Sequence, residues 1–151
     1  MYPKVSIIMN CFNGDKYLYD AINSVIIQKY ENWELIFWDN LSHDRSREII
    51  LSYPDKRIKY FKAKNFSTLY KSRNLAIKKT KGKFICFLDT DDWWNKNKLS
   101  KQVELIKKNR KVKFIYSNLY LYNQNNKTKR LISKNKLPDG KITQNLLNDY
   151  K

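Results

Sequence analysis

The stretch VSIIMNCFNGDKYLYDAINSVIIQKYENWELIFWD, residues 5–39, decides the fold because two patterns alternate in it. Short apolar runs at residues 4–9 and 33–38 are typical of strands that are buried on both faces. Between them, residues 15–28 place apolar side chains at the spacing of one helix face. A strand, a helix and a second strand in this order predict two parallel strands joined by a helical crossover.

The same alternation continues along the chain and predicts an α/β fold, with a mostly parallel central sheet and helices on both faces. Gly82 is expected to cap the carboxyl end of the third helix. The further helices are expected at residues 44–53, 68–80 and 95–109, with a weak one at 142–150, and the further strands at 57–62, 83–88 and 113–122, followed by a turn at 123–126 and a returning strand at 129–132.

Composition indicates one globular domain. Of 151 residues, 42% are hydrophobic, which argues against disorder. No apolar run approaches the length of a membrane span, and the first residues lead into a strand without resembling a signal peptide. Cys11 and Cys86 lie in or beside apolar strands and are expected to be reduced. We therefore expect a cytoplasmic protein.

The net charge of +17 is uneven: residues 1–95 carry +5 and residues 96–151 carry +12. A basic end favours an anionic partner, either a phosphorylated acceptor or the inner face of a membrane, as a peripheral contact. The alternative is a lysine-rich composition without a role. There is no recognisable nucleic-acid motif, so nucleic acid is not an expected partner.

An acidic cluster, Asp89, Asp91 and Asp92, follows the strand predicted at residues 83–88. Neighbouring carboxylates repel one another, and this repulsion raises their pKa values, as does poor solvation near an apolar core. Capping of the next helix explains one or two of them. A divalent cation, Mn²⁺ or Mg²⁺, gives all three a role, because such ions take oxygen ligands. We favour the metal.

Polar residues follow the first, second and fourth predicted strands. Right-handed crossovers bring the carboxyl ends of these strands to one edge of the sheet, where open α/β sheets bind ligands. A ligand site is therefore expected there. It comprises Asn10-Cys11-Phe12-Asn13-Gly14, Asp39-Asn40 and Asp89-Thr90-Asp91-Asp92.

These residues, in this order, resemble the family 2 inverting glycosyltransferases of GT-A fold. The resemblance covers roughly residues 3–122 and is carried by residues 5–50 and by SRNLAIKKTKGKFICFLDTDDWW, residues 72–94, where Ser72 replaces the family's Ala. It implies a Rossmann-like GT-A sandwich, a nucleotide-sugar donor that is usually UDP-linked, Mn²⁺ or Mg²⁺, and a role in polysaccharide biosynthesis. Residues 1–122 would form the donor-binding core, and the basic residues 123–151 the start of the acceptor-binding half.

The resemblance implies roles for the acidic cluster. Asp91 is the first choice of metal ligand. Asp89 would bind the metal, directly or through water, or the donor ribose, and Asp92 would be a second ligand or the helix cap. Phe12, where the family usually has Tyr, would either stack beside the base or pack in the core.

Asp39 would accept the imide proton of uracil. Asn40 replaces an acid of the family, which leaves the identity of the base open. Arg73 would pair with the diphosphate, hold an acid at the sheet edge, or stay solvated. The full set expected to bind the nucleotide-sugar is Asn10, Phe12, Asn13, Asp39, Asn40, Arg73, Asn74, Asp89 and Thr90, and the metal set is Asp91, Asp89 and Asp92.

An inverting transfer also needs a general base near the acceptor hydroxyl. Beyond Asp92 the acids are Glu104, on a helix, and the weak candidates Asp139 and Asp149. We therefore expect the donor half of a longer enzyme, or a shortened relative whose acceptor site is completed by a partner chain. The acceptor would be a glycan or lipid-linked.

Two other functions remain open beside the transferase. One is a non-catalytic module that binds a nucleotide-sugar, a polyanion or a membrane surface. The other is a sugar-phosphate nucleotidyltransferase, which ranks lower because the loop after the first strand offers only Gly14 and Lys16 for holding a triphosphate.

Overall fold

The computed structural model describes residues 4–140. They divide into two compact units, one ending at Asn109 and one beginning at Arg110. The helix expected at residues 142–150 and the candidate base Asp149 lie outside the described residues. The functional boundary expected after Tyr122 falls within the second unit and stays a prediction.

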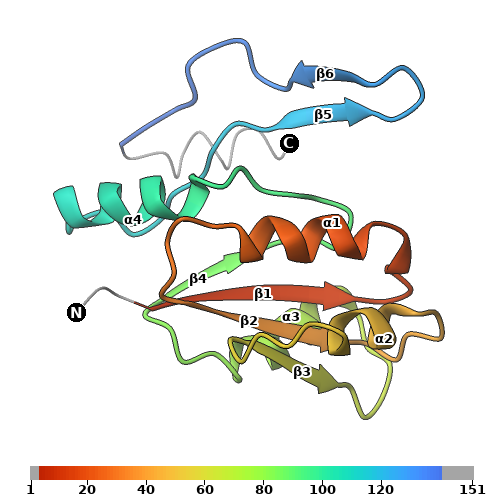
Figure 1. Ribbon diagram of the computed structural model, residues 1–151. Coiled ribbons are helices and arrows are strands. Elements are labelled where there is room, and N and C mark those ends of the chain that lie inside the picture. Colours follow the sequence, from red (N-terminus) through yellow and green to blue (C-terminus); the bar gives the residue numbers. More distant parts are fainter. Residues whose placement is uncertain (1–3, 141–151) are drawn as a thin grey trace. The chain divides into compact units, whose positions relative to one another are not determined.

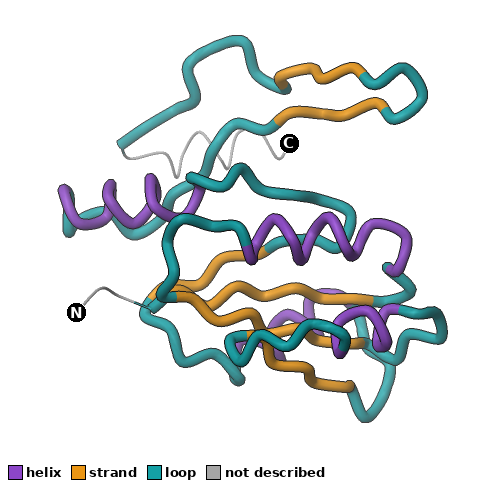
Figure 2. The backbone as a smooth tube through the Cα atoms, viewed as in Figure 1, coloured by secondary structure: helices purple, strands orange, loops and turns teal. Residues whose placement is uncertain are grey.

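The first unit is an α/β layer structure, which confirms the predicted fold class. Its four strands form one parallel sheet in the order β3-β2-β1-β4 (Figures 1 and 2). The helices begin or end a few residues inside the predicted ranges. Within residues 4–140, none has the length and apolar composition needed to cross a bilayer. The strands are β1 (Val5–Cys11), β2 (Trp33–Asp39), β3 (Ile58–Lys62) and β4 (Phe84–Phe87), and the helices are α1 (Asp15–Ile26), α2 (Ser46–Leu51), α3 (Leu69–Ile77) and α4 (Lys98–Lys108).

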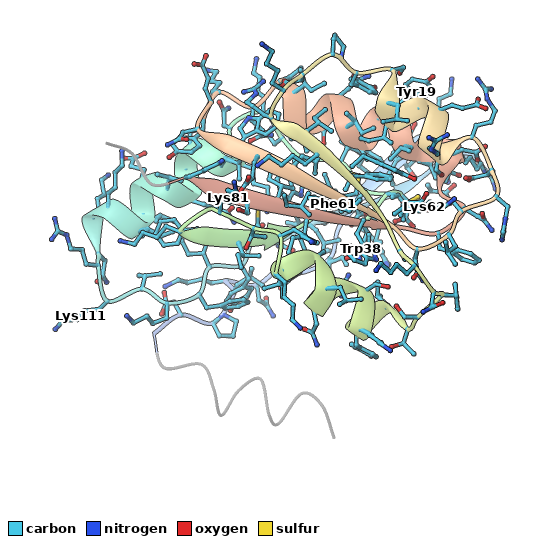
Figure 3. The ribbon with its side chains drawn as sticks, turned by 90° about the horizontal axis from the view of Figure 1, so that it is seen from below. Tyr19, Trp38, Phe61, Lys62, Lys81 and Lys111 are labelled. Atoms are coloured by element: carbon cyan, nitrogen blue, oxygen red, sulfur yellow. The ribbon has the colours of Figure 1, made fainter. Side chains whose placement is uncertain are left out.

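Helices cover both faces of this sheet, as expected. Apolar side chains of α1, α2 and α4 pack on one face in the larger core cluster, which includes the fully buried Leu18 and Leu99. Helix α3 packs on the other face through Ala76. Trp38 and Phe61, labelled in Figure 3, belong to this smaller cluster. The central strands β1 and β2 are therefore buried on both sides, which explains their continuous apolar sequence.

A fully buried carboxylate, Glu34, ties the amino-terminal end of the sheet together. It accepts hydrogen bonds from Ser6 Oγ at 2.7 Å, Lys59 Nζ at 2.5 Å and the Lys81 amide at 2.6 Å, and Lys4 Nζ lies 3.2 Å away. Burial alone would raise the pKa of Glu34. The hydrogen bonds from Lys59, Ser6, Lys81 and Lys4 outweigh it and lower the pKa to about 2.

Gly82 has a different role from the expected helix cap. Helix α3 ends at Ile77, well before it. A Cβ atom at Gly82 would lie 2.6 Å from the Ser6 amide nitrogen and 2.8 Å from the Lys4 carbonyl oxygen. The residue is thus required by close backbone contact with β1, where the Gly82 amide also donates to Ser6 Oγ at 2.8 Å.

Gly82→Ala is therefore expected to destabilise the domain by about 2 kcal/mol, the cost of overpacking against a backbone that cannot move freely. Urea unfolding followed by tryptophan fluorescence measures the change. Lys101→Ala serves as the comparison, because Lys101 is exposed on helix α4 and such surface substitutions change stability by less than about 0.5 kcal/mol. A Gly82→Ala variant as stable as the wild type would show that β1 and this turn separate easily.

The second unit contains an antiparallel hairpin of β5 (Tyr120–Asn123) and β6 (Thr128–Leu131). The predicted turn and returning strand are confirmed. The strand predicted over residues 113–122 is wrong in its first part: residues 113–119 form no strand in the described chain. Alternation alone does not make a strand, because its backbone groups need a neighbouring strand to pair with. Phe114 instead stacks on Tyr116.

Candidate functional site

The carboxyl ends of β1, β2 and β4 meet at one edge of the sheet. The backbone amide of Asn40 donates to the Cys11 carbonyl at 2.8 Å, and this bond joins the ends of β1 and β2. A Cβ built on Gly14 would lie 2.7 Å from Thr90 Oγ1, so the loops after β1 and β4 are in close contact. The structure thereby brings the three polar clusters together.

Side-chain hydrogen bonds also connect the loop after β1 to the loop after β2. Ser42 Oγ accepts from the Asn13 amide at 3.1 Å, and Asn13 Oδ1 accepts from the His43 amide at 2.8 Å. The Asp44 carboxylate accepts from the amides of Asp15 and Ser46, and so caps the starts of α1 and α2 together. Sequence reasoning missed this role of Asp44. The signal available was an Asp beside a predicted helix start.

Within the acidic cluster, Asp89 is held from the side by α3. Arg73 Nη2 donates to Asp89 Oδ1 at 2.8 Å, and the Arg73 guanidinium lies 5.4 Å from the centre of the Phe87 ring. Of the roles considered for Arg73, the structure shows the contact with an acid at the sheet edge. Asn74, the next residue, is exposed on α3.

The other two carboxylates are close enough to affect one another. Burial raises the pKa of Asp92, and the negative charges of Asp91 and Asp89 raise it further. Among residues 4–140, no three His, Cys, Asp or Glu side chains converge as a ready-made metal site. The carboxylates fit an ion that takes one or two protein ligands and the rest from water and phosphate, as Mg²⁺ does.

Asp39 and Asn40 are buried, and their polar atoms are engaged within the chain. Asp39 accepts from the Tyr60 hydroxyl and from the Ser42 amide, both at 2.7 Å. The side-chain nitrogen of Asn40 donates to the Ser67 carbonyl, and its side-chain oxygen accepts from the Ser67 backbone amide. The structure thus shows these two side chains bonded to strand β3 and to neighbouring loops.

Asn10 differs, because its amide nitrogen and oxygen are buried with no hydrogen-bond partner in the described chain. Trp38, its register partner on β2, has an indole nitrogen in the same condition. Leaving such groups unpaired costs about 1–3 kcal/mol each. These positions therefore call for a water molecule or a polar ligand group.

Phe12 is 49% exposed, so it is not a core residue.

Of the weak candidates for the general base, Asp139 lies in the second unit and pairs with Lys136 at 2.9 Å, with both side chains exposed. Glu104 pairs with Lys108 on α4 and is exposed, as expected for a solvated helix residue.

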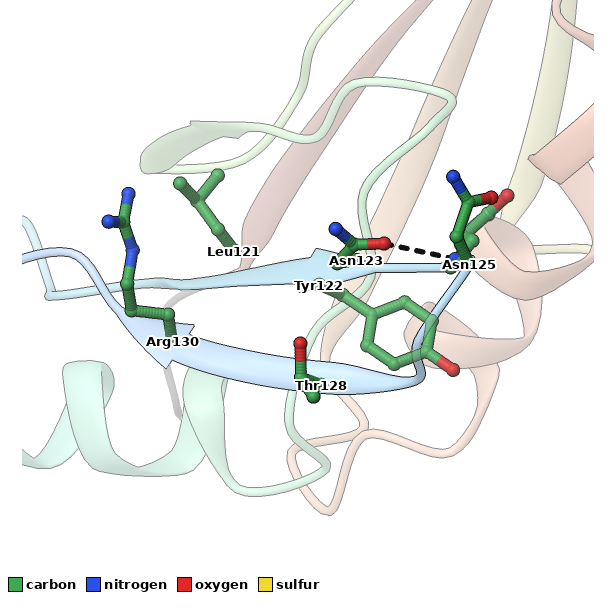
Figure 4. Close-up of a pocket in the computed structure, with 7 residues that line it drawn as sticks. Leu121, Tyr122, Asn123, Asn125, Thr128 and Arg130 are labelled. Carbon is green, nitrogen blue, oxygen red and sulfur yellow. Dashed lines mark hydrogen bonds between the residues drawn. The ribbon is translucent and has the colours of Figure 1, made fainter.

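A separate hollow of about 590 Å³ belongs to the hairpin of the second unit (Figure 4). None of the residues that line it is acidic, and the Asn125 amide donates to Asn123 Oδ1 beside it. It therefore offers no metal ligand of the carboxylate type. Its lining consists of Leu121, Tyr122, Asn123, Gln124, Asn125, Thr128 and Arg130.

A parallel four-stranded sheet with helices on both faces is the Rossmann-like architecture of GT-A glycosyltransferase domains. The model of glycosyl transferase family 2 matches residues 6–150. The chain belongs to this family of transferases.

Among its relatives is UDP-Glc:alpha-D-GlcNAc-diphosphoundecaprenol beta-1,3-glucosyltransferase WfgD of Escherichia coli, 36% identical over 93% of this chain and 55% of the relative. The structure of S. aureus TarS 1-349 in complex with UDP-GlcNAc is similar with a TM-score of 0.68 and 30% identity, over 71% of this chain and 32% of that one.

A second similar structure is the mannosyltransferase PcManGT of Pyrobaculum calidifontis in complex with GDP-Man and Mn²⁺, with a TM-score of 0.64, 18% identity, and coverage of 70% of this chain and 33% of that one. It shares the fold. The chain thus spans about half the length of WfgD and a third of each solved structure.

Proposed function

We propose that this chain is the donor-binding part of a glycosyltransferase that takes a UDP-sugar together with Mn²⁺ or Mg²⁺ and transfers the sugar with inversion. The observation that carries the proposal is the placement of Asp89, Asp91 and Asp92 at the sheet edge where β1, β2 and β4 end. The two relatives whose names or titles contain UDP-sugars support the choice of nucleotide.

The nucleotide would lie along this edge. The buried side-chain amide of Asn10, which has no partner in the described chain, supports a polar ligand group at this edge. The other expected contacts lie nearby in the sequence of elements: Phe12 and Asn13 follow β1, Thr90 follows β4, and Asn74 is on α3. Asp39 and Asn40 would shape the base-binding end, through contacts made by their buried side chains. Arg73 would orient Asp89 toward the donor.

Asp91 and Asp92, with Asp89 directly or through water, would hold the cation. A bound divalent ion supplies positive charge at the oxygens of the departing diphosphate, where negative charge develops. The carboxylates suit it, because burial and then the charges of Asp91 and Asp89 raise the pKa of Asp92, and a bound cation offsets both effects.

The acceptor proposed is a lipid-linked glycan, by analogy with the diphosphoundecaprenol-linked acceptor in the name of WfgD. The excess of basic residues, +17 overall, is complementary to a diphosphate or an anionic lipid surface. The chain would therefore work on the cytoplasmic side of a membrane as a peripheral protein. The general base would come from residues outside the described part or from a partner chain.

Calorimetry with UDP, GDP, ADP and UTP tests the donor proposal. We expect saturable binding of UDP that requires Mn²⁺ and is lost with a chelator, because the carboxylates and the diphosphate share the ion. Absence of heat with UDP and UDP-sugars in Mn²⁺ would contradict the proposal. Preference for UTP over UDP would favour the nucleotidyltransferase instead.

A further inference from the structure

Two phenylalanine rings meet at the edge of the sheet although they come from different loops. Phe12 follows β1, and Phe66 lies between β3 and α3. Their ring centroids are 4.9 Å apart with planes at 64°, an edge-to-face contact. Phe12 is 49% exposed and Phe66 61%, so each ring still presents much of its surface to solvent.

One buried residue, Asn40, fixes the backbone beside both rings. Its own amide donates to the carbonyl of Cys11, the residue before Phe12, at 2.8 Å. Its side-chain nitrogen donates to the carbonyl of Ser67, the residue after Phe66, at 2.8 Å, and Oδ1 accepts from the Ser67 amide at 3.2 Å. Asn40 is 6% exposed, so its side chain has little surface to offer a ligand.

The family resemblance already implies Phe12 as a contact of the donor base. We propose that Phe66 adds a second ring to this stacking surface, and that Asn40 is a positioning residue that holds the two rings side by side. This rests on the proposed function, since it needs a nucleotide at this edge. Aromatic rings are effective stacking partners for bases, and a surface already ordered before binding loses less entropy when the ligand arrives. An aspartate at position 40 would be unable to donate to the Ser67 carbonyl.

The rings are tested by titrating the full 151-residue chain, in Mn²⁺, with UDP and with inorganic pyrophosphate, which has no base. Phe66→Ala should weaken UDP binding roughly tenfold and leave pyrophosphate binding unchanged. Tyr70→Ala is the matched control, because Tyr70 is a 78% exposed aromatic residue on α3 outside the pair, and it should change neither. Unchanged UDP affinity in Phe66→Ala would overturn the proposal.

Asn40→Asp tests the positioning role. It should weaken UDP binding without affecting pyrophosphate, and this effect should largely vanish in a Phe66→Ala background, since coupled residues are not additive. Asn23→Asp makes the same change at an exposed position of α1, where the side chain only accepts from the Tyr53 hydroxyl, and should bind UDP as the wild type does. Equal or tighter UDP binding by Asn40→Asp would overturn the positioning role of Asn40.

The outcomes separate this proposal from the proposed function. A wild-type chain that binds neither UDP nor pyrophosphate overturns both. A wild-type chain that binds the two equally well retains a diphosphate site but overturns the stacking surface alone. Circular dichroism melts check that each variant folds. If Asn40→Asp unfolds, Phe66→Ala and its Tyr70→Ala control still decide the question.

Discussion

Asp91→Asn should lower the affinity for UDP measured in Mn²⁺ by at least about a hundredfold, since even groups that only support a metal ligand are worth 10–100-fold in metal affinity. Asparagine keeps the shape of the side chain but removes the charge that a hard cation prefers. Asp91 lies exposed in the turn after β4, so the fold should survive. Calorimetry in Mn²⁺ and in chelator measures the effect, and affinity without the ion should not change.

Asp20→Asn provides the control for that experiment, because it removes the same charge from an exposed position on α1. It should leave UDP binding and its dependence on Mn²⁺ as in the wild type. If Asp91→Asn retains the full Mn²⁺ dependence, Asp91 is excluded as the main ligand, and Asp92 becomes the residue to test next.

Glu34→Gln should lower the free energy of unfolding by about 3 kcal/mol at pH 7, because it leaves the network of Lys59 and Lys4 without its buried negative charge. The sign of the pH dependence follows from the depressed pKa. Glu34 titrates near 2 in the folded protein instead of at its ordinary value of 4.5. Its stabilisation is therefore complete above pH 4.5 and is lost as pH falls from there through about 2.

Urea unfolding at a series of pH values measures this difference between wild type and Glu34→Gln, which should shrink as pH falls through that range. Glu48→Gln is the matched control. Glu48 forms an exposed pair with Arg45 at 3.6 Å, and its replacement should cost less than about 0.5 kcal/mol. A difference between wild type and Glu34→Gln that stays constant with pH would show that the pKa of Glu34 is the same in the folded and the unfolded chain, so that the network does not stabilise its charge.

The parallel sheet and its polar edge could be predicted, because the spacing of apolar residues along the chain reflects which faces of a strand or helix are buried. The apolar runs of β1 and β2 are buried on both faces, and parallel strands place their carboxyl ends together. The first part of the strand expected at residues 113–122 could not be predicted safely, because alternation describes the side chains while a strand also requires a neighbouring strand to pair with.

Contacts between residues far apart in the chain could not be predicted from the sequence. Asn40 reaches Ser67 across 27 positions, and Glu34 reaches Ser6 across 28. A charged residue near the start of an apolar strand gives no sign of which lysines will surround it. The loop after β3 was also overlooked, although a third parallel strand must end at the same edge and bring Phe66 there.

The Glu34 network also bears on how the domain folds. Its members come from β1, β2, β3 and the turn before β4, so the network is complete only when all four have assembled. A carboxylate that is buried before its partners arrive carries a penalty of several kcal/mol. Partly assembled sheets that bury Glu34 without the lysines are therefore unfavourable. The buried charge of Glu34 therefore makes the assembly of these strands more cooperative. Fewer partly folded states with an exposed, aggregation-prone core are then populated.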